Sequence, residues 1–245
     1  MKTRSLQIKI KRFLKKLGID DYLHRYGPKT YTFAEHVEAL LLMAVCQMSF
    51  VRFEQFQKMQ GRRCPTESAF CRSRKRIPLR LWQGLLELTA GLSSGEVAID
   101  GTGFSKTNPS FHYLKRIDGK CPKNYTKLSA ILDMNTKKFL AMRIRTTPRH
   151  DMQDVKYLLK RVCNVGVLCG DSGYDAEWLH EICYWKEIQT FIPPRKNVRL
   201  RKFRKKQMAN WSKERYNKRS NVESGFSAIK RKYGGAIRAK KIQGM

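Results

Sequence analysis

Acidic residues are scarce in this sequence. Only 20 Asp and Glu stand against 51 Lys and Arg, which gives a formal net charge of +31. A chain with this charge repels itself in the folded state unless a polyanion screens it, and nucleic acid is the most obvious polyanion. The imbalance excludes a generic solvated surface and predicts a protein that binds nucleic acid.

Long apolar runs are absent as well. The longest, residues 37–51, contains Glu38, Gln47 and Ser49 and falls short of the roughly 20 apolar residues that a membrane-spanning helix needs. The basic N-terminus carries no apolar stretch typical of a secretion signal. We therefore interpret residues 37–51 as a buried helix. We expect no membrane association and a cytoplasmic, nucleoid-associated protein.

The seven cysteines form no Cys-x2-Cys pair, and their number is odd and their spacing irregular. This pattern predicts reduced, mostly buried thiols of an intracellular protein and not a disulfide framework. A zinc site would have only His180 and Cys183 at helical spacing, without a second ligand pair. The thiol interpretation is therefore preferred.

Hydrophobic residues make up 41% of the chain, enough for a packed core. Helical patterns dominate residues 1–94, with a long helix over 32–60 that is interrupted near Ser49, and further helices after Pro65 and Pro78. The pattern then changes, because residues 97–100, 126–134, 165–171 and 188–192 read as buried or alternating strands. Helical segments at 151–164 and 175–187 and a final helix separate or follow them. We predict an all-helical N-terminal domain (1–94) and an α/β domain (95–245) with a mixed sheet flanked by helices.

Two aspartates follow buried strands directly. Asp100 ends "VAID" and precedes Gly-Thr-Gly, and Asp171 follows "VGVLCG" and precedes Ser-Gly-Tyr. Active sites of open α/β sheets collect at such strand ends. Three hard oxygen ligands, with Glu223 as the third, would suit Mg²⁺ or Mn²⁺.

Glu223 is a lone carboxylate in the most basic helix. Tyr216, Arg219, Glu223 and Lys230 fall within a stripe about 60° wide on a helical projection. Other interpretations remain open: an Asp after a strand is often a turn or cap residue, and Glu223 could pair with Arg219 on a solvated face.

Taken together, these residues resemble the DDE transposases of bacterial and archaeal insertion sequences, which have a ribonuclease H-like catalytic domain. The resemblance rests on Asp100 in "AIDGTGFS", on Asp171 in "GDSGYDAEWLH" and on the pattern Tyr-x2-Arg-x3-Glu-x6-Lys, which begins at Tyr216. The segment "RHD" (149–151) is also similar. The resemblance covers most of residues 95–235, and the N-terminal helices look like the family's end-binding region.

The resemblance implies metal-dependent cleavage and strand transfer at the ends of an insertion sequence. Two Mg²⁺ or Mn²⁺ ions would be held by the catalytic residues Asp100, Asp171 and Glu223. Tyr216, Arg219 and Lys230 would bind phosphates and position the DNA strand. The implied partners are double-stranded DNA at the element ends and the target, together with a second copy of the chain in a homodimeric DNA complex.

The alternative is a truncated, non-catalytic derivative that occupies element ends. It is motivated by the end of the chain at "AKKIQGM", soon after the Glu223 helix, where relatives continue. A nuclease selective for DNA structure is a third possibility. Outside the motif, residues 72–76 and 199–206 predict phosphate contacts, with the second stretch in an exposed loop. Trp82, Trp178 and Trp185 are expected in the core, and Trp211 is expected to anchor its loop.

Overall fold

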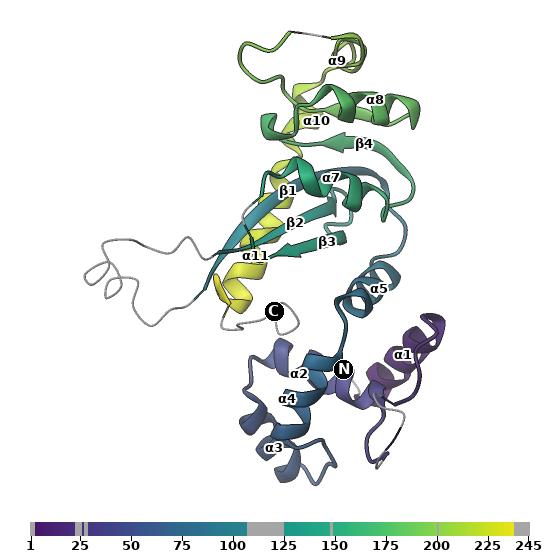
Figure 1. Cartoon of the computed structure of the whole chain (residues 1–245), viewed down its shortest axis with the longest axis vertical. Coiled ribbons are helices and arrows are strands. Elements are labelled where there is room, and N and C mark those ends of the chain that lie inside the picture. Colours follow the sequence, from purple (N-terminus) through teal and green to yellow (C-terminus); the bar gives the residue numbers. More distant parts are fainter. Residues whose placement is uncertain are drawn as a thin grey trace, which may run out of the picture. The chain divides into compact units, whose positions relative to one another are not determined.

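The computed structural model describes residues 3–22, 26, 29–106, 125–147, 149–199 and 201–237. They fall into two compact units, one up to Leu88 and the other from Thr89 onward. The first unit is helical and the second is built around a β-sheet (Figure 1). The end of the chain at 239–245 and Cys121 lie outside the described residues.

The first unit contains the helices that the sequence pattern predicts. They are α1 (Thr3–Lys16), α2 (Phe33–Cys46), α3 (Phe50–Met59), α4 (Glu67–Arg76) and most of α5 (Leu79–Ala90). The expected interruption near Ser49 is confirmed, because the Ser49 hydroxyl accepts a hydrogen bond from the Arg52 amide at 3.3 Å and begins α3. Gly91, at φ +78°, follows the end of α5. Two apolar clusters form the core of this unit. One contains Val37 and Ile77, and the other contains Phe70.

Within the described ranges, no single helix combines the length and apolarity that a membrane span requires. The helices α2 and α3 pass that test only as a pair that bends by 104° at the break between them.

The second unit is built on a six-stranded mixed sheet in the order β3-β2-β1-β4-β5, with β6 paired to the far end of β1. Strands β1, β2 and β3 are antiparallel neighbours, whereas β4 runs parallel to β1 and to β5. This arrangement confirms the predicted α/β class and is consistent with a ribonuclease H-like fold. The strands are β1 (Gly95–Lys106), β2 (Tyr125–Asp133), β3 (Phe139–Arg145), β4 (Val165–Cys169), β5 (Gln189–Phe191) and β6 (Ala236–Ile237).

Helices pack on both faces of this sheet. They are α7 (Met152–Leu159), α8 (Glu177–Trp185), α9 (Lys202–Met208), α10 (Lys213–Asn217) and α11 (Ser220–Tyr233). Figure 1 shows α7 and α11 on opposite faces of the strands β1–β3. The side chains of β1 alternate between these two layers.

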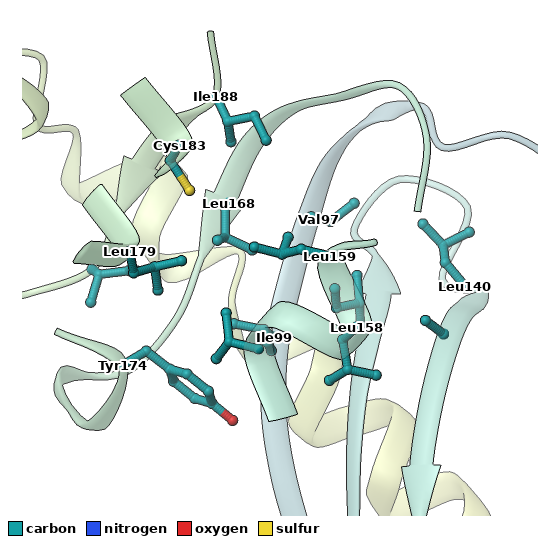
Figure 2. Close-up of a cluster of buried hydrophobic side chains, with 14 of the residues drawn as sticks. Val97, Ile99, Leu140, Leu158, Leu159, Leu168, Tyr174, Leu179, Cys183 and Ile188 are labelled. Atoms are coloured by element: carbon teal, nitrogen blue, oxygen red, sulfur yellow. The ribbon is translucent and has the colours of Figure 1, made fainter. Parts of the chain in front are cut away.

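The alternation along β1 decides on which face Asp100, in the middle of this strand, is placed. Val97 and Ile99 belong to the core beneath α7 and α8, which Figure 2 shows, whereas Ala98 belongs to the core beneath α11. Successive side chains on a strand point to opposite faces. Asp100 therefore lies on the same face as Ala98, under α11.

Helix α11 approaches the sheet closely at Gly225. A Cβ atom at this position would lie 2.8 Å from Leu132 Cδ1 and 3.0 Å from Phe139 Cζ, closer than packed carbon atoms normally come. On either side, Val222 and Phe226 are buried against the same strands. The missing side chain of Gly225 thus sets the height of α11 above the sheet, two residues from Glu223.

Four local predictions are wrong. The strand predicted at 97–100 does not end at Asp100, because β1 continues to Lys106 and pairs with β2 as far as Ser105. Residues 199–206 are not all loop, because α9 begins at Lys202 and buries Arg204, whose guanidinium lies 2.7 Å from the Asp175 carboxylate. Trp185 is 71% exposed and outside the core. Among the six described cysteines, only Cys169 and Cys183 are buried, so the thiols are not mostly buried.

Candidate active site

Asp100 lies half-buried on β1, with its side chain 17% exposed. Its Oδ1 accepts a hydrogen bond from the Gly101 amide at 2.7 Å, and its Oδ2 lies 3.5 Å from Arg219 Nη1. Burial raises the pKa of Asp100 above its ordinary value, and the nearby charges of Asp171 and Glu223 raise it further. The hydrogen bond from the Gly101 amide and the charge of Arg219 lower this pKa but do not cancel the increase. The charges of Asp171 and Glu223 therefore act on Asp100, in the middle of β1.

Asp171 is brought beside Asp100 by the register of the parallel pair β1 and β4. Ala98 pairs with Cys169, and each aspartate comes two residues later in its own chain segment. The Asp171 Oδ1 also accepts a hydrogen bond from the Gly173 amide at 2.8 Å and begins a short 3-10 turn. The capping role considered from the sequence is therefore real, and it leaves the carboxylate close enough to contribute to the raised pKa of Asp100.

Glu223 lies in the first turn of α11 and is 55% exposed. Its Oε1 accepts a hydrogen bond from Arg219 Nη2 at 2.6 Å. The Arg219 guanidinium, which also contacts Asp100, therefore bridges an acid on β1 and an acid on α11. Although burial opposes its charge, Glu223, Tyr216 and Asp100 raise the pKa of Arg219, so the bridging group stays a cation.

The acids have the chemistry of a divalent-cation site. Asp100 and Glu223 direct carboxylate oxygens at one positive group, and Asp171 adds its charge from the neighbouring strand. Among the described residues, however, no three His, Cys, Asp or Glu side chains are arranged to hold one metal ion. Carboxylate oxygens are donors that Mg²⁺ and Mn²⁺ prefer, and here the Arg219 guanidinium lies beside the carboxylates of Asp100 and Glu223.

The Tyr/Arg/Glu/Lys stripe does not lie on one regular helix. Tyr216 belongs to α10 and Arg219 precedes α11, so the stripe is interrupted after Asn217. Tyr216 packs on Trp211, with ring centroids 5.3 Å apart, and Trp211 packs in turn on Phe191 of β5. These contacts support the anchoring role expected for Trp211.

Lys230 lies on α11, about two turns after Glu223. Its Nζ is 5.4 Å from the centre of the Phe104 ring, near the far end of β1. A shallow hollow of about 600 Å³ runs along this stretch of the helix between Glu223 and Lys230. Three hydroxyl side chains and a further base share it: Ser220, Ser224, Ser227 and Arg231.

A second polar group, missed in the sequence, supports β1 from the other face. Lys127 Nζ lies 2.5 Å from Asp151 Oδ1 and donates to the Arg149 carbonyl at 2.6 Å. A Cβ on Gly101 would lie 2.5 Å from the same Asp151 oxygen, so this pair fits against β1 only beside a glycine. Asp151 does not cap α7 with its side chain, whereas His150 Nδ1 accepts a hydrogen bond from the Met152 amide at 3.3 Å.

Tyr174 also borders the acids. Its ring packs against Gly170 and Ile99 at the edge of the core in Figure 2, and its hydroxyl is buried without a hydrogen-bond partner among the described residues. Burial raises the pKa of Tyr174 well above its usual value, and the charges of Asp151, Asp100 and other nearby acids add to this. Tyr174 follows Asp171 by three residues, whereas Lys127 lies on β2, which carries none of the motif residues, so no local signal indicated Lys127.

The zinc alternative is not supported. His180 contacts Asp175 Oδ1 at 3.1 Å and Thr190 Oγ1 at 2.8 Å, and Cys183 lies in the apolar core. Burial lowers the pKa of His180, which keeps the ring neutral, although Asp175 opposes this shift. Both residues stabilise the packing of α8 on β5.

Comparison with known proteins gives a family. No curated protein matches this chain. A cryo-EM structure of a piggyBac transposase synaptic complex with hairpin DNA is similar at a TM-score of 0.41 and 14% identity, over 81% of this chain and 50% of that one. This chain therefore spans half the length of that protein. The family model described as a transposase DDE domain matches residues 92–244, which is most of the chain. The protein thus belongs to the DDE transposase domain family.

Proposed function

We propose that the chain is a transposase that cleaves DNA at the ends of an insertion sequence and transfers the cut strand. The observation that carries this proposal is the convergence of Asp100 and Glu223, 123 positions apart in the sequence, on one cationic group. Acids that gather around a cation on a partly buried sheet face form the kind of site that a metal-dependent phosphoryl transfer needs.

Asp100, Asp171 and Glu223 are the residues that would hold two Mg²⁺ or Mn²⁺ ions. Bound there, such ions supply Lewis-acid stabilisation of the reacting phosphate. The Arg219 guanidinium would leave its place between Asp100 and Glu223 and pair with a DNA phosphate, a partner that its fork geometry suits. Lys230, at the far end of the same hollow, would contact a phosphate further along the strand.

Tyr216 would position the DNA strand beside Arg219. The net charge of +31 favours double-stranded DNA as the partner, at both the element ends and the target. We further propose that residues 1–94 bind the element ends, that residues 95–245 carry out catalysis and that the DNA complex contains a homodimer. Support for the first role comes from the helical fold of that unit and from the basic last turn of α4.

The test is a cleavage assay on a supercoiled plasmid that carries the DNA flanking this reading frame. The wild type should nick this plasmid in the presence of Mn²⁺ or Mg²⁺. Glu223→Gln should reduce the nicking rate at least 100-fold, because it removes a carboxylate that would hold the metal ions at the reacting phosphate. Glu214→Gln on α10 is the matched control, since Glu214 is exposed and outside the acid group.

The outcome separates the alternatives. Equal nicking by wild type and Glu223→Gln would refute the proposed site. Binding of the flanking DNA without any nicking would favour the non-catalytic derivative. Equal nicking of a plasmid without the flanking DNA would favour a nuclease that does not recognise element ends.

A further inference from the structure

An aromatic cluster lies exposed at the β5 edge of the sheet, away from the acids. Tyr184 and Trp185 end α8 and are 37% and 71% exposed. Phe203 of α9 packs on both, with ring centroids 5.5 Å from Tyr184 and 6.1 Å from Trp185. We call these three residues the aromatic platform.

The exposure of Trp185 calls for an explanation, because this residue has the largest apolar surface of any side chain. Burial of an aromatic residue of this size stabilises a fold. Trp185 is instead left mostly exposed, although its indole contacts the rings of Tyr184 and Phe203. The contacts of Trp185 with Tyr184 and Phe203 limit the freedom of the ring, so a flat partner could stack on it at little cost in entropy.

Lysine ammonium groups lie beside the platform. Lys206 Nζ is 4.3 Å from the centre of the Tyr184 ring and donates a hydrogen bond to its hydroxyl at 2.9 Å. Lys202 Nζ is 5.5 Å from the centre of the Phe203 ring. Both lysines are exposed and remain accessible to an anion. Aromatic faces bordered by cations suit a partner that is both planar and negatively charged.

The platform also borders an open hollow of about 450 Å³. Tyr184 and Trp185 form one side, and the others are formed by the following residues: Glu187, Ile188, Gln189 and Gln207. The Glu187 carboxylate repels phosphate, so an anionic partner would place its phosphates toward Lys202 and Lys206 and its neutral part toward the hollow. This division matches a nucleotide, with a base on one side and a phosphate on the other.

We propose that the aromatic platform binds an unpaired DNA base by stacking, while Lys202 and Lys206 bind the phosphates that flank it. Within a duplex the faces of the bases are covered by their neighbours, so the ligand is single-stranded or locally unpaired DNA. The net charge of +31 favours DNA over a protein partner for this surface. The inference does not depend on the cleavage activity, because binding needs neither the acids nor a metal.

The experiment measures binding of the full chain to a fluorescein-labelled 12-nucleotide oligothymidine and to a 12-base-pair duplex, in EDTA. Trp185→Ala should weaken binding to the single strand about 5- to 150-fold, the effect of losing one base–aromatic stack. Binding to the duplex should change less than twofold. Trp185→Phe should restore most of the single-strand affinity, because a stacking ring is kept.

The matched control is Tyr233→Ala. Tyr233 is another exposed ring with a lysine beside it, Lys232 Nζ at 5.4 Å, but it lies on α11 and not on the platform. This variant should bind the oligothymidine as the wild type does. In addition, the oligothymidine should quench tryptophan emission in the wild type and much less in Trp185→Phe.

Unchanged single-strand affinity in Trp185→Ala would overturn the proposal and leave the platform to a protein partner. An equal loss of single-strand and duplex affinity would also overturn it, because stacking on a base cannot account for duplex binding. Equal thermal midpoints of the variants and the wild type would show that the exposed substitutions leave the fold intact.

Discussion

The close approach of α11 to the sheet at Gly225 allows a quantitative prediction for Gly225→Ala. A Cβ at this position meets Leu132 Cδ1 at 2.8 Å and Phe139 Cζ at 3.0 Å, and Leu132 is completely buried. Inserting a methyl group into a packed core costs about 1–3 kcal/mol. Alanine in a helix interior is favoured over glycine by about 0.8–1.0 kcal/mol. The two effects oppose each other, and we expect a net destabilisation of about 0–2 kcal/mol.

Ala228→Gly is the matched control on the same helix. Ala228 is exposed, so this variant measures the helix preference alone and should lose about 1 kcal/mol. The assay is native-state amide hydrogen exchange of α11, which reports the free energy of opening of one segment in a chain with two units. Gly225→Ala should show exchange as fast as the wild type or faster.

The reasoning would be refuted if Gly225→Ala slowed exchange of α11 by as much as Ala228→Gly accelerates it. That result would mean that the new methyl group meets no obstacle and that the glycine does not set the height of the helix. With the proposed activity, Gly225→Ala should also reduce plasmid nicking at least 10-fold, because displacement of α11 moves Glu223 relative to Asp100, and a misplacement of about 1 Å can cost 100-fold.

Three further predictions concern single side chains. Asp100→Asn should stabilise the protein at neutral pH by about 0.5–2 kcal/mol and so raise its thermal midpoint. Burial raises the pKa of Asp100 in the folded state, so the charged carboxylate costs stability above that pKa. The difference between variant and wild type should vanish once the pH falls below the pKa of Asp100 in the unfolded chain. A difference that grows toward low pH would contradict this. Asp154→Ala should lower the free energy of unfolding, measured by urea titration, by about 3–5 kcal/mol. Asp154 is 1% exposed, and its removal leaves Arg145 Nε, which lies 2.6 Å from its carboxylate, without this partner. A loss below 1 kcal/mol would refute this reasoning, and Glu214→Ala is the surface control. Tyr174→Phe should leave the thermal midpoint unchanged or raise it, since the lost hydroxyl has no hydrogen-bond partner in the described part of the chain, and a loss above about 1 kcal/mol would show a hidden one.

Much of the fold was predictable, because the signals that define it are local. The helical periods of residues 1–94 and the change to alternating strands follow from spacing along the chain. Alternation along β1 is a property of any extended strand, so Val97 and Asp100 had to face opposite sides. Helix caps such as Ser49 and the glycine after α5 likewise act within a few residues.

The errors arose where contacts between distant segments, and not the local sequence pattern, decided the structure. Trp185 is a large apolar residue of the kind usually found in a core, yet α8 ends with it at the β5 edge of the sheet. Its contacts with Tyr184 and with Phe203 of α9 leave it 71% exposed. The basic stretch that includes Arg204 resembled a solvated loop. It forms a helix because the Asp175 carboxylate, 29 residues earlier, binds the Arg204 guanidinium in the interior.

The sequence by itself determined the class of fold, since this depends on residue type and short spacing. The role of the three acids stays a prediction that rests on the family resemblance. Only the tertiary structure decided that the Arg219 guanidinium lies between Asp100 and Glu223, and that Lys127 and Asp151 support β1 beside Gly101. Charges from distant segments interact over a few ångströms, and their separation is set by the packing height of α11 and α7 on the sheet. No periodicity within a single segment encodes that height.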